Sequence, residues 1–540
     1  MKLKKKGWLC LFWALAYGTL FFGTAQAEDL PHKTVEELLP ELQTFLSEKK
    51  EAWDVPGASI SIIENGKIYT LKSGVQSIRT NAPIEDHSIF CIMSLSKAAT
   101  VAILQQLVDE GRLSLDDAVT QHLPWFKLKT PEATQKVKVR HLISHCMGLP
   151  SFSGDSLWHL GFSQKEIIQK LSEIPLKYEV GERYGYQNMF LGIAGLLIEK
   201  ILNRPLEDIY DDYFFKKLDM TYSSLGPPPS TFFQKIKQFF KKEARHNPPF
   251  LTTGHQRWKD KVIEIVSLKE PYIFPGMSGI NATSPDYAKF LACLVNGGVI
   301  EFGPHKGTRL FSERAWNEMS SSPIPIKYVK DNNTQFPLIR MQKGSFYYGQ
   351  GLFGMKYGEG DRVIDILSHM GAGSGWRSFF MIVPKYKLGI VILNNYGSIN
   401  TNLFPEVFAY HFIDRYFDFS PHDWHDDILK KQLQFREHSK TLYQDCVVGP
   451  SRPWEQIVGK YTNSLYGTVE IFQNKKQLFF KYRKKDVELQ HVGGAVFSFP
   501  SHTLSSRFGD EDLGSLSIID KKLNFSLAQE GDAFVKEEKK

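Results

Sequence analysis

The sequence predicts an α/β domain followed by a small all-β domain. With 540 residues, the chain is longer than one domain usually needs. Strand-forming runs with turn signals stand near both ends of residues 28–417, and apolar-periodic runs typical of helices fill the middle. If the terminal strands pair with each other, this unit is one sheet with a helical insertion. Residues 453–540 change to short alternating strands, which predicts a separate domain, barrel-like or sandwich-like.

Two hairpins mark the ends of the predicted sheet. In VPGASISIIENGKIYTLKSG, two β-branched runs flank Asn65-Gly66, and a type I′ turn needs a positive φ at both of its central residues. In WRSFFMIVPKYKLGIVILNN, the turn falls at Pro384-Lys385. We therefore expect antiparallel strand pairs on either side of these two turns.

Helices are predicted between the two hairpins and after the second one. SKAATVAILQQLVDEG ends in Gly111, and NMFLGIAGLLIEKILNRP ends in Asn203 before a proline, which are signals of helix C-termini. The helix PEVFAYHFIDRYF closes the first unit near Phe417. Residues 418–452 are polar and are predicted to link the two domains.

Residues 1–27 have the form of a signal peptide. MKLKKK is a basic n-region, GWLCLFWALAYGTLFF is an apolar h-region, and AQA, ending at Ala27, is a small-residue cleavage site. The apolar run is short for a bilayer span, which needs about 20 residues, and this favours cleavage over a retained anchor. The sequence therefore predicts export, either to the periplasm or as a secreted protein.

Removal of the signal peptide changes the charge of the chain. Residues 1–27 hold four lysines and no acidic residue, so the formal net charge falls from +7 to +3. Nothing in the near-neutral remainder argues for a nucleic-acid partner. Export permits disulfides, but the four widely spaced cysteines of the mature chain fit buried thiols at least as well. They are Cys91, Cys146, Cys293 and Cys446.

Residues 230–245 form a predicted basic amphipathic helix. Phenylalanines and an isoleucine lie on one helical face, and lysines and an arginine lie largely elsewhere. Such a helix can lie on an anionic membrane surface, or it can pack its aromatic face on the domain. Peripheral membrane contact through this segment is therefore one of two alternatives.

The stretch FCIMSLSKAATVAIL contains the candidate nucleophile. Ser94 and Lys97 are three residues apart and share one face of a helix, whereas Ser96 points about 100° away from Lys97. Ser94 also stands at the helix start, where backbone N–H groups and the helix dipole favour developing negative charge. The S-x-x-K pattern is typical of serine acyl-transfer enzymes, although alone it also fits an N-cap serine beside a solvated lysine.

Two further motifs follow this one in the chain. Tyr186 and Asn188 precede an apolar helix, and His369 and Gly371 precede a strand. With S-x-x-K, Y-x-N and K/H-x-G in this order, the sequence resembles the serine β-lactamase and penicillin-binding-protein superfamily, in the branch of class C β-lactamases, DD-peptidases and related esterases. RHLISHCMGLP and PGMSGINATSPDYAKFLACLVNGG resemble further segments of that branch, so the resemblance covers residues 35–417. It implies a β-lactamase/transpeptidase-like antiparallel sheet flanked by helices, with a helical subdomain.

The resemblance implies a nucleophile and a base. Ser94 attacks a carbonyl group and forms an acyl-enzyme. A tyrosine hydroxyl, with a reference pKa of about 10, is not a base near neutrality, and the ammonium group of Lys97 would stabilise the phenolate of Tyr186. Lys97 and Tyr186 therefore form a coupled unit, in which either group is a candidate for the formal base.

The same resemblance implies a set of substrate-binding residues. Asn188 orients a substrate amide, Gly371 lets the strand backbone approach the substrate, and the N–H of Ala372 joins that of the nucleophile in the oxyanion hole. His369 replaces the lysine of many β-lactamases and is largely neutral at pH 7. Met370 replaces a hydroxyl residue that usually helps to hold a substrate carboxylate. Both departures weaken the case for β-lactams or D-Ala-D-Ala termini as substrates.

The expected activity is acyl transfer to water through a Ser94 acyl-enzyme, with a small-molecule or peptide substrate that is an ester, amide or peptide. A D-alanyl-D-alanine carboxypeptidase or a β-lactamase is the alternative, with Ser374 or Arg377 as candidates to hold a carboxylate. A non-catalytic binding protein on the same fold is a rival from another class.

A metallohydrolase that uses His141 and His145 is a second rival. The two histidines have i, i+4 spacing but lack the glutamate of H-E-x-x-H. The run HDWHDD at residues 422–427 fits a solvated linker better than a metal site. We therefore expect no metal and no cofactor, and the sequence leaves the oligomeric state open.

Overall fold

The structure is a computed structural model of the chain. It describes residues 29–227, 251–258, 261–265, 270–321, 345–373, 375–397, 402–445, 453–483, 485–493, 496–500, 513–519, 522–525 and 534–537. The predicted signal peptide, segment 230–245, Ser374 and Cys446 lie outside these residues. Among the helices in the described part, none has the length and apolar character to cross a bilayer. Cys91, Cys146 and Cys293 are buried free thiols, which is one of the two alternatives that the sequence left open.

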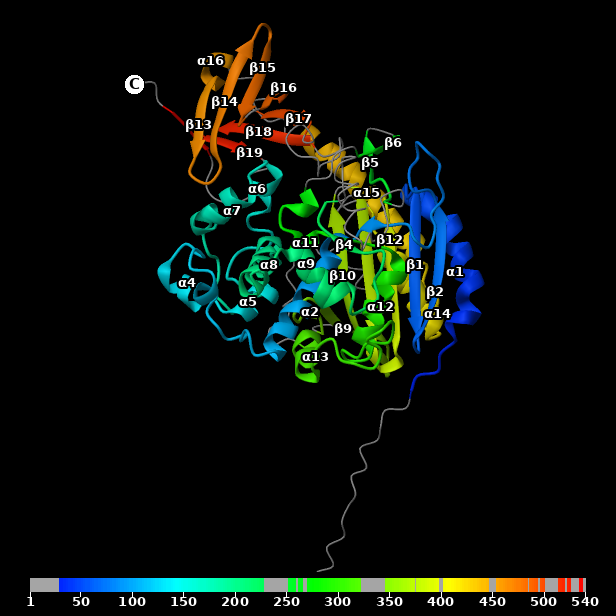
Figure 1. Ribbon diagram of the computed structural model, residues 1–540. Coiled ribbons are helices and arrows are strands. Elements are labelled where there is room, and N and C mark those ends of the chain that lie inside the picture. The colour runs from blue at the N-terminus through cyan, green and yellow to red at the C-terminus, as the bar shows by residue number, and fades with distance from the viewer. Residues whose placement is uncertain are drawn as a thin grey trace, which may run out of the picture.

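A seven-stranded antiparallel sheet forms the centre of the first domain (Figure 1). Its strands in spatial order are β2 (Lys67–Gly74), β1 (Gly57–Glu64), β12 (Leu388–Asn394), β11 (Trp376–Val383), β10 (Arg362–Gly373), β9 (Phe353–Glu359) and β8 (Tyr347–Tyr348). Since β1 pairs with β12, the strands near the two ends of the unit lie side by side, as predicted. Asn65 and Gly66 have φ values of 49° and 79°, which confirms the positive φ at both central residues that a type I′ turn needs.

Helices cover both faces of the sheet. On one face, α1 (Val35–Lys49) and α14 (Phe404–Tyr416) join β1, β11 and β12 in a buried apolar cluster. The other face packs against the helical region that lies between the two hairpins. Its helices are α2 (Ser96–Asp109), α3 (Val119–His122), α4 (Pro131–Lys136), α5 (Val139–Ile143), α6 (Asp155–His159), α7 (Gln164–Lys170), α8 (Asn188–Leu202), α9 (Leu206–Tyr210), α11 (Pro275–Ser278), α12 (Ser284–Val295) and α13 (Glu313–Ser320).

Short strands and left-handed residues connect these helices. Gly111 (φ 69°) and Asn203 (φ 50°) end α2 and α8, so both predicted helix ends are confirmed. A three-stranded sheet in the order β3, β7, β4 and a two-stranded sheet of β5 and β6 complete this part. The bounds are β3 (Phe90–Cys91), β4 (Ser224–Leu225), β5 (His255–Trp258), β6 (Lys261–Glu264) and β7 (Ile280–Ala282).

The segment predicted to be a linker contains a long helix. α15 (Trp424–Asp445) runs beside α14, and Trp424 and Ile428 are buried one turn apart. The indole Nε1 of Trp424 donates a hydrogen bond of 2.6 Å to Asp414 Oδ2 on α14. The buried stripe is so short that it leaves the average polarity of residues 418–452 unchanged, and for this reason the sequence reading missed the helix.

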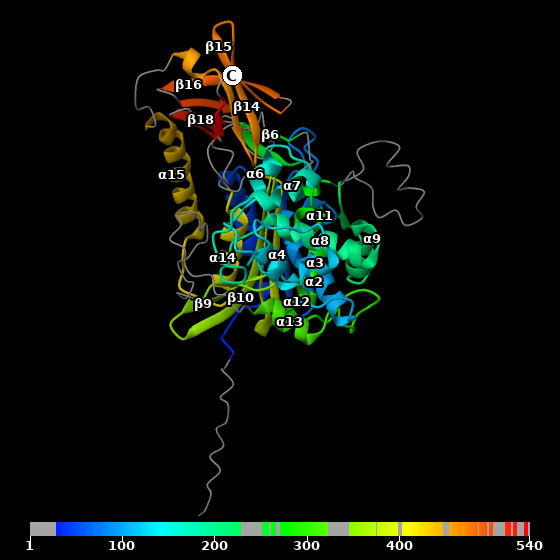
Figure 2. The ribbon, with the colours of Figure 1, turned by 90° about the vertical axis from the view of Figure 1, so that its left-hand side faces the viewer.

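The C-terminal strands close into a barrel after α16 (Trp454–Ile457) (Figure 2). This confirms the predicted small all-β domain. On its side toward the first domain, Arg483 pairs with Glu166 on α7 at 3.0 Å and lies 4.1 Å from the centroid of the Phe162 ring. The barrel strands are β13 (Gly459–Asn463), β14 (Gly467–Asn474), β15 (Gln477–Tyr482), β16 (Lys485–Gly493), β17 (Val496–Pro500), β18 (Leu513–Ile519), β19 (Lys522–Phe525) and β20 (Phe534–Lys536).

A buried ion pair joins the sheet to α14. Arg377 on β11 pairs with Glu406 on α14, and their side chains are only 1% and 2% exposed. Arg377 lies on the same face of β11 as Phe379, which packs in the α14 cluster. The guanidinium group of Arg377 thus lies on the α14 side of the sheet, where it is paired with Glu406.

Replacing Arg377 by methionine should destabilise the protein strongly, because the carboxylate of Glu406 would stay buried without its partner. We expect a loss of about 3–5 kcal/mol in the free energy of unfolding, measured by urea denaturation. The ion pair between Arg483 and Glu166 at the surface offers a control. Arg483→Ala should change the free energy of unfolding by at most about 1 kcal/mol. Equal stability of Arg377→Met and the unmodified protein would contradict this account.

Candidate active site

Ser94 lies in a tight turn that leads from β3 into α2. Met93 has a φ of 52°, in the left-handed region, and the turn continues as a short 3-10 helix over Met93–Leu95. The Ser96 hydroxyl donates to the Met93 carbonyl at 2.7 Å and accepts the N–H of Ile280 at 3.1 Å. Ser96 therefore holds the turn together, and Ser94 is the serine that remains for chemistry.

Strand β10 packs directly on this turn, and two glycines permit it. A Cβ atom on Gly371 would meet Ser378 Oγ and the carbonyl oxygen of Ile92, and one on Gly373 would lie 2.7 Å from Met93 Sδ. The sequence reading assigned the close approach at Gly371 to the substrate. In the structure the close approach is to the nucleophile turn itself, and contact of Gly371 with substrate stays a prediction.

Lys97 connects the serine to the tyrosine. Its Nζ donates to Ser94 Oγ at 2.7 Å and to the Met277 carbonyl at 3.1 Å, and it lies 5.1 Å from the centroid of the Tyr186 ring. The Lys97 side chain is fully buried. The structure thus brings together the three residues that the sequence reading proposed for catalysis.

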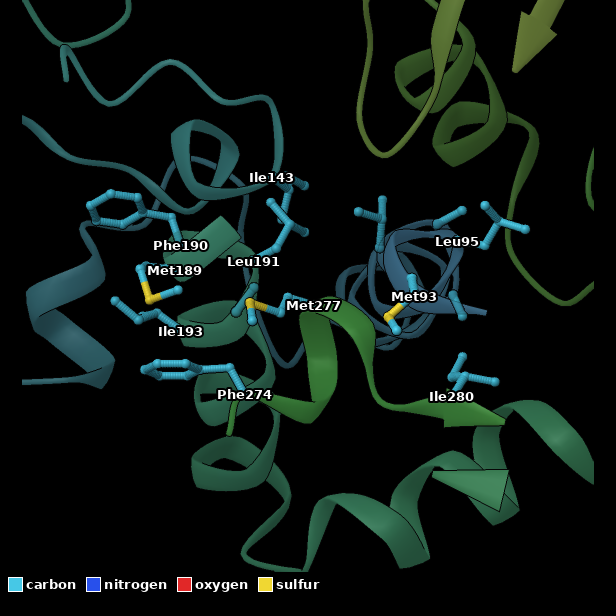
Figure 3. Close-up of a cluster of buried hydrophobic side chains, with 14 of the residues drawn as sticks. Met93, Leu95, Ile143, Met189, Phe190, Leu191, Ile193, Phe274, Met277 and Ile280 are labelled. Carbon is cyan, nitrogen blue, oxygen red and sulfur yellow. The ribbon is translucent and has the colours of Figure 1, made fainter. Parts of the chain in front are cut away.

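The elements that hold Lys97 are packed by an apolar cluster (Figure 3). Met277 of α11 lies between the start of α2 and the side chains of α8, beside Leu191. Met93 and Leu95 lie near Ile280 of β7 on the other side. This packing places the Met277 carbonyl where it accepts a hydrogen bond from Lys97.

Asn188 begins α8, and its side chain is oriented by an acid that the sequence reading missed. Asn188 Nδ2 donates to Asp155 Oδ2 at 2.6 Å, and Asp155 is only 3% exposed. A carboxylate oxygen accepts hydrogen bonds, so the amide nitrogen of Asn188 is the atom that faces Asp155. An acidic residue in the first turn of a short helix gives no sequence signal of this contact.

His369 on β10 is buried and neutral. Its Nδ1–H donates to the Met370 carbonyl at 2.7 Å, so Nε2 is unprotonated and accepts a hydrogen bond of 3.3 Å from the Tyr348 hydroxyl. Burial and the nearby charge of Lys97 lower the pKa of His369 to about 3. His369 therefore supplies no positive charge at pH 7.

Ala372 and Met370 lie on the same stretch of β10. β9 pairs with β10 only as far as Ser368, so Ala372 stands beyond the paired part, opposite Arg377 of β11. The Met370 side chain packs with the α14 cluster, and Arg377 Nη2 lies 3.9 Å from its sulfur. Met370 and Arg377 therefore face α14, and the use of the Ala372 N–H as an oxyanion donor stays a prediction.

Aromatic side chains surround Tyr186. The centroids of the His145, Phe152, His369 and Phe353 rings lie 4.5, 5.5, 6.3 and 6.5 Å from that of Tyr186. Phe152 is 42% exposed and has a φ of 64°. Most of these rings come from segments far apart in the sequence, so no local sequence pattern could predict that they surround Tyr186.

The two histidines of the metallohydrolase hypothesis bind the backbone. His141 Nδ1 accepts the N–H of Lys138 at 3.1 Å, and His145 Nδ1 accepts the N–H of Gln187 at 3.0 Å. In the described part of the chain, no group of three or more His, Cys, Asp or Glu side chains could hold a metal ion. In this geometry, both histidines stabilise the backbone through their Nδ1 atoms.

The structure brings the serine and lysine of the S-x-x-K motif together with Tyr186, which is the arrangement that the sequence resemblance implies. Residues 42–402 match the family model described as Beta-lactamase, and the chain belongs to the β-lactamase family.

Individual relatives are distant. Protein flp of Staphylococcus aureus strain MW2 is 27% identical over 187 residues, which are 34% of this chain and 38% of that protein, so little more than a third of its length is matched. Unguisins hydrolase ungD' of Aspergillus campestris is 22% identical over 435 residues, which are 77% of this chain and 73% of that protein. An octameric penicillin-binding protein homologue from Pyrococcus abyssi has the same fold, with a TM-score of 0.56 and 20% identity over 92% of this chain and 100% of that one.

The buried His369 should make stability depend on pH. Its pKa is about 3 in the folded protein and about 6.5 in an unfolded chain, so only the unfolded state takes up its proton as the pH falls below 6.5. Stability from this group is complete above pH 6.5 and is lost as the pH falls toward 3. Between pH 7 and pH 5, we expect His369 to contribute a loss of about 2 kcal/mol in the free energy of unfolding.

Urea denaturation of His369→Gln at both pH values checks this prediction. The glutamine keeps a polar side chain near Tyr348 but does not titrate. Its loss of stability on acidification should be smaller than that of the unmodified protein by the same amount, and an equal loss in both proteins would count against a neutral buried His369.

Proposed function

We propose that this chain is an exported serine hydrolase that cleaves an ester, amide or peptide by acyl transfer to water through Ser94. The observation that carries the proposal is the 2.7 Å hydrogen bond between Lys97 Nζ and Ser94 Oγ beneath the ring of Tyr186. Export rests on the n-region, h-region and cleavage site of residues 1–27.

The proposed reaction has two halves. Ser94 Oγ bonds to the substrate carbonyl carbon, its proton passes to the Lys97–Tyr186 unit, and the bond to the leaving group breaks as that group receives the proton. Water then attacks the acyl-enzyme and loses a proton to the same unit. The bond between the acyl carbon and Ser94 Oγ breaks, the unit returns the proton to Ser94 Oγ, and the acid is released. The N–H groups of Ser94 and Ala372 are the proposed donors to the oxyanion.

Esters and small amides rank above β-lactams as substrates. The neutral His369 and the paired Arg377 offer no positive charge to a substrate carboxylate, and Met370 faces α14. A D-alanyl-D-alanine carboxypeptidase or a β-lactamase is the second candidate, supported by the motif set that such enzymes share with this chain. One distant relative is named a hydrolase, which agrees with the general class.

Covalent labelling tests the proposed nucleophile. Incubation with a fluorophosphonate should add the mass of one phosphonyl group to the mature protein, and Ser94→Ala should show no addition by intact-mass spectrometry. Ser47→Ala serves as the control, because Ser47 is exposed on α1, which covers the opposite face of the sheet from the helical region that contains Ser94. The control should still react at Ser94.

Penicillin provides the second arm of the same experiment. Labelling by fluorophosphonate alone, with the penicillin left intact, would favour an esterase-like pocket. A lasting penicillin adduct would favour the carboxypeptidase alternative, and Ser94-dependent hydrolysis of the penicillin would favour the β-lactamase alternative. If neither reagent gives a Ser94-dependent adduct, the non-catalytic binding protein becomes the better account.

Chelation separates the serine mechanism from the metallohydrolase rival. Because the Nδ1 atoms of His141 and His145 accept backbone hydrogen bonds, we expect ester hydrolysis and fluorophosphonate labelling to be unchanged after prolonged treatment with EDTA. Loss of activity with EDTA and its return with zinc would contradict the proposed mechanism.

A further inference from the structure

One buried residue, His145, is bonded to the backbone on both sides of Tyr186. His145 follows α5, is fully buried, and has a φ of 59°, in the left-handed region. Its carbonyl oxygen accepts the N–H of Gly185 at 2.8 Å, and its Nδ1 accepts the N–H of Gln187 at 3.0 Å. The residues immediately before and after Tyr186 are thus both bonded to His145.

The His145 ring also packs on the rings of the site. Its centroid lies 4.5 Å from that of Tyr186 and 4.6 Å from that of Tyr348. The main chain of Tyr186 is bonded as well, since its carbonyl accepts the N–H of Phe152 at 2.7 Å and its N–H donates to Ser151 Oγ at 3.2 Å. Every one of these contacts restricts where the Tyr186 ring can lie.

We propose that His145 is a positioning residue, which sets the place of the Tyr186 ring over Lys97 by binding Gly185 and Gln187 and by packing on the ring. This inference rests on the proposed function, because the place of Tyr186 matters only if Tyr186 takes part in proton transfer. A displacement of about 1 Å at a catalytic group lowers rates by about 100-fold.

A proton-relay role for His145 is the competing explanation, and the structure disfavours it. Nδ1 accepts the Gln187 N–H, so the ring proton is on Nε2, which has no hydrogen-bond partner in the described part of the chain. Burial, together with the charge of Lys97, lowers the pKa of His145 well below its usual value. The ring therefore stays neutral and keeps Nδ1 available as an acceptor.

A matched pair of variants tests the positioning role. In His145→Asn, the side-chain amide can present an oxygen close to the position of Nδ1, whereas the longer side chain of His145→Gln cannot place its amide there. We measure the rate of fluorophosphonate labelling at Ser94 by intact mass, with thermal unfolding as a check on folding. We expect His145→Gln to label about 10- to 100-fold more slowly than the unmodified protein, and His145→Asn to recover most of that loss.

Two controls separate positioning from general damage. His141→Gln alters a neighbouring histidine that also accepts a backbone N–H but belongs to a different contact, so it should label at the unmodified rate. In a Tyr186→Phe background, His145→Asn and His145→Gln should label equally, because His145 acts through the tyrosine hydroxyl.

Each outcome decides the inference. Three results would overturn the positioning role of His145 and leave the proposed function intact. They are labelling of His145→Gln at the unmodified rate, labelling of His145→Asn as slow as that of His145→Gln, and a difference between these two variants that persists in the Tyr186→Phe background. If the unmodified protein is not labelled by the fluorophosphonate, both the proposed function and the role of His145 are contradicted. If His145→Gln does not fold, nitrogen NMR of the unmodified protein decides, since a proton on His145 Nδ1 at pH 7 is incompatible with the inference.

Discussion

The site depends on keeping one ammonium group buried. Lys97 is fully buried, and an unpaired charge in that position would cost several kcal/mol. Its charge is offset by Ser94 Oγ, by the Met277 carbonyl and by the face of the Tyr186 ring. α2 supplies the lysine, α11 the carbonyl and the segment before α8 the tyrosine, so three parts of the helical region must meet for the charge to be accommodated.

Burial next to this charge determines the state of two histidines. Desolvation is the main cause of the lowered pKa of both His145 and His369, and the charge of Lys97 adds to it. As neutral rings, they can accept hydrogen bonds, from the Gln187 N–H in one case and from the Tyr348 hydroxyl in the other. Burial beside a cation thus keeps both rings uncharged, and they in turn bind the segment that contains Tyr186 and the strand that contains Tyr348.

Local sequence signals predicted the parts of this arrangement that depend on a few neighbouring residues. The Asn65-Gly66 turn and the ends of α2 and α8 follow from backbone preferences, and the separation of Ser94 from Ser96 follows from helix geometry. The contacts of Asp155, His145 and Tyr348 were not predictable, because each depends on a partner more than twenty residues away. α15 was missed because its buried stripe is too short to alter the polarity of the segment.

The buried thiols have a consequence for the reactivity of the protein. Cys91 stands three residues before Ser94, and desolvation raises its pKa to about 12, while that of Cys146 rises to about 11. The thiolate is the reactive form of cysteine, so at neutral pH these two sulfur atoms are poor nucleophiles as well as inaccessible ones. An electrophile that enters this part of the molecule therefore meets two unreactive sulfur atoms, so under the proposed function these two thiols would not compete with Ser94.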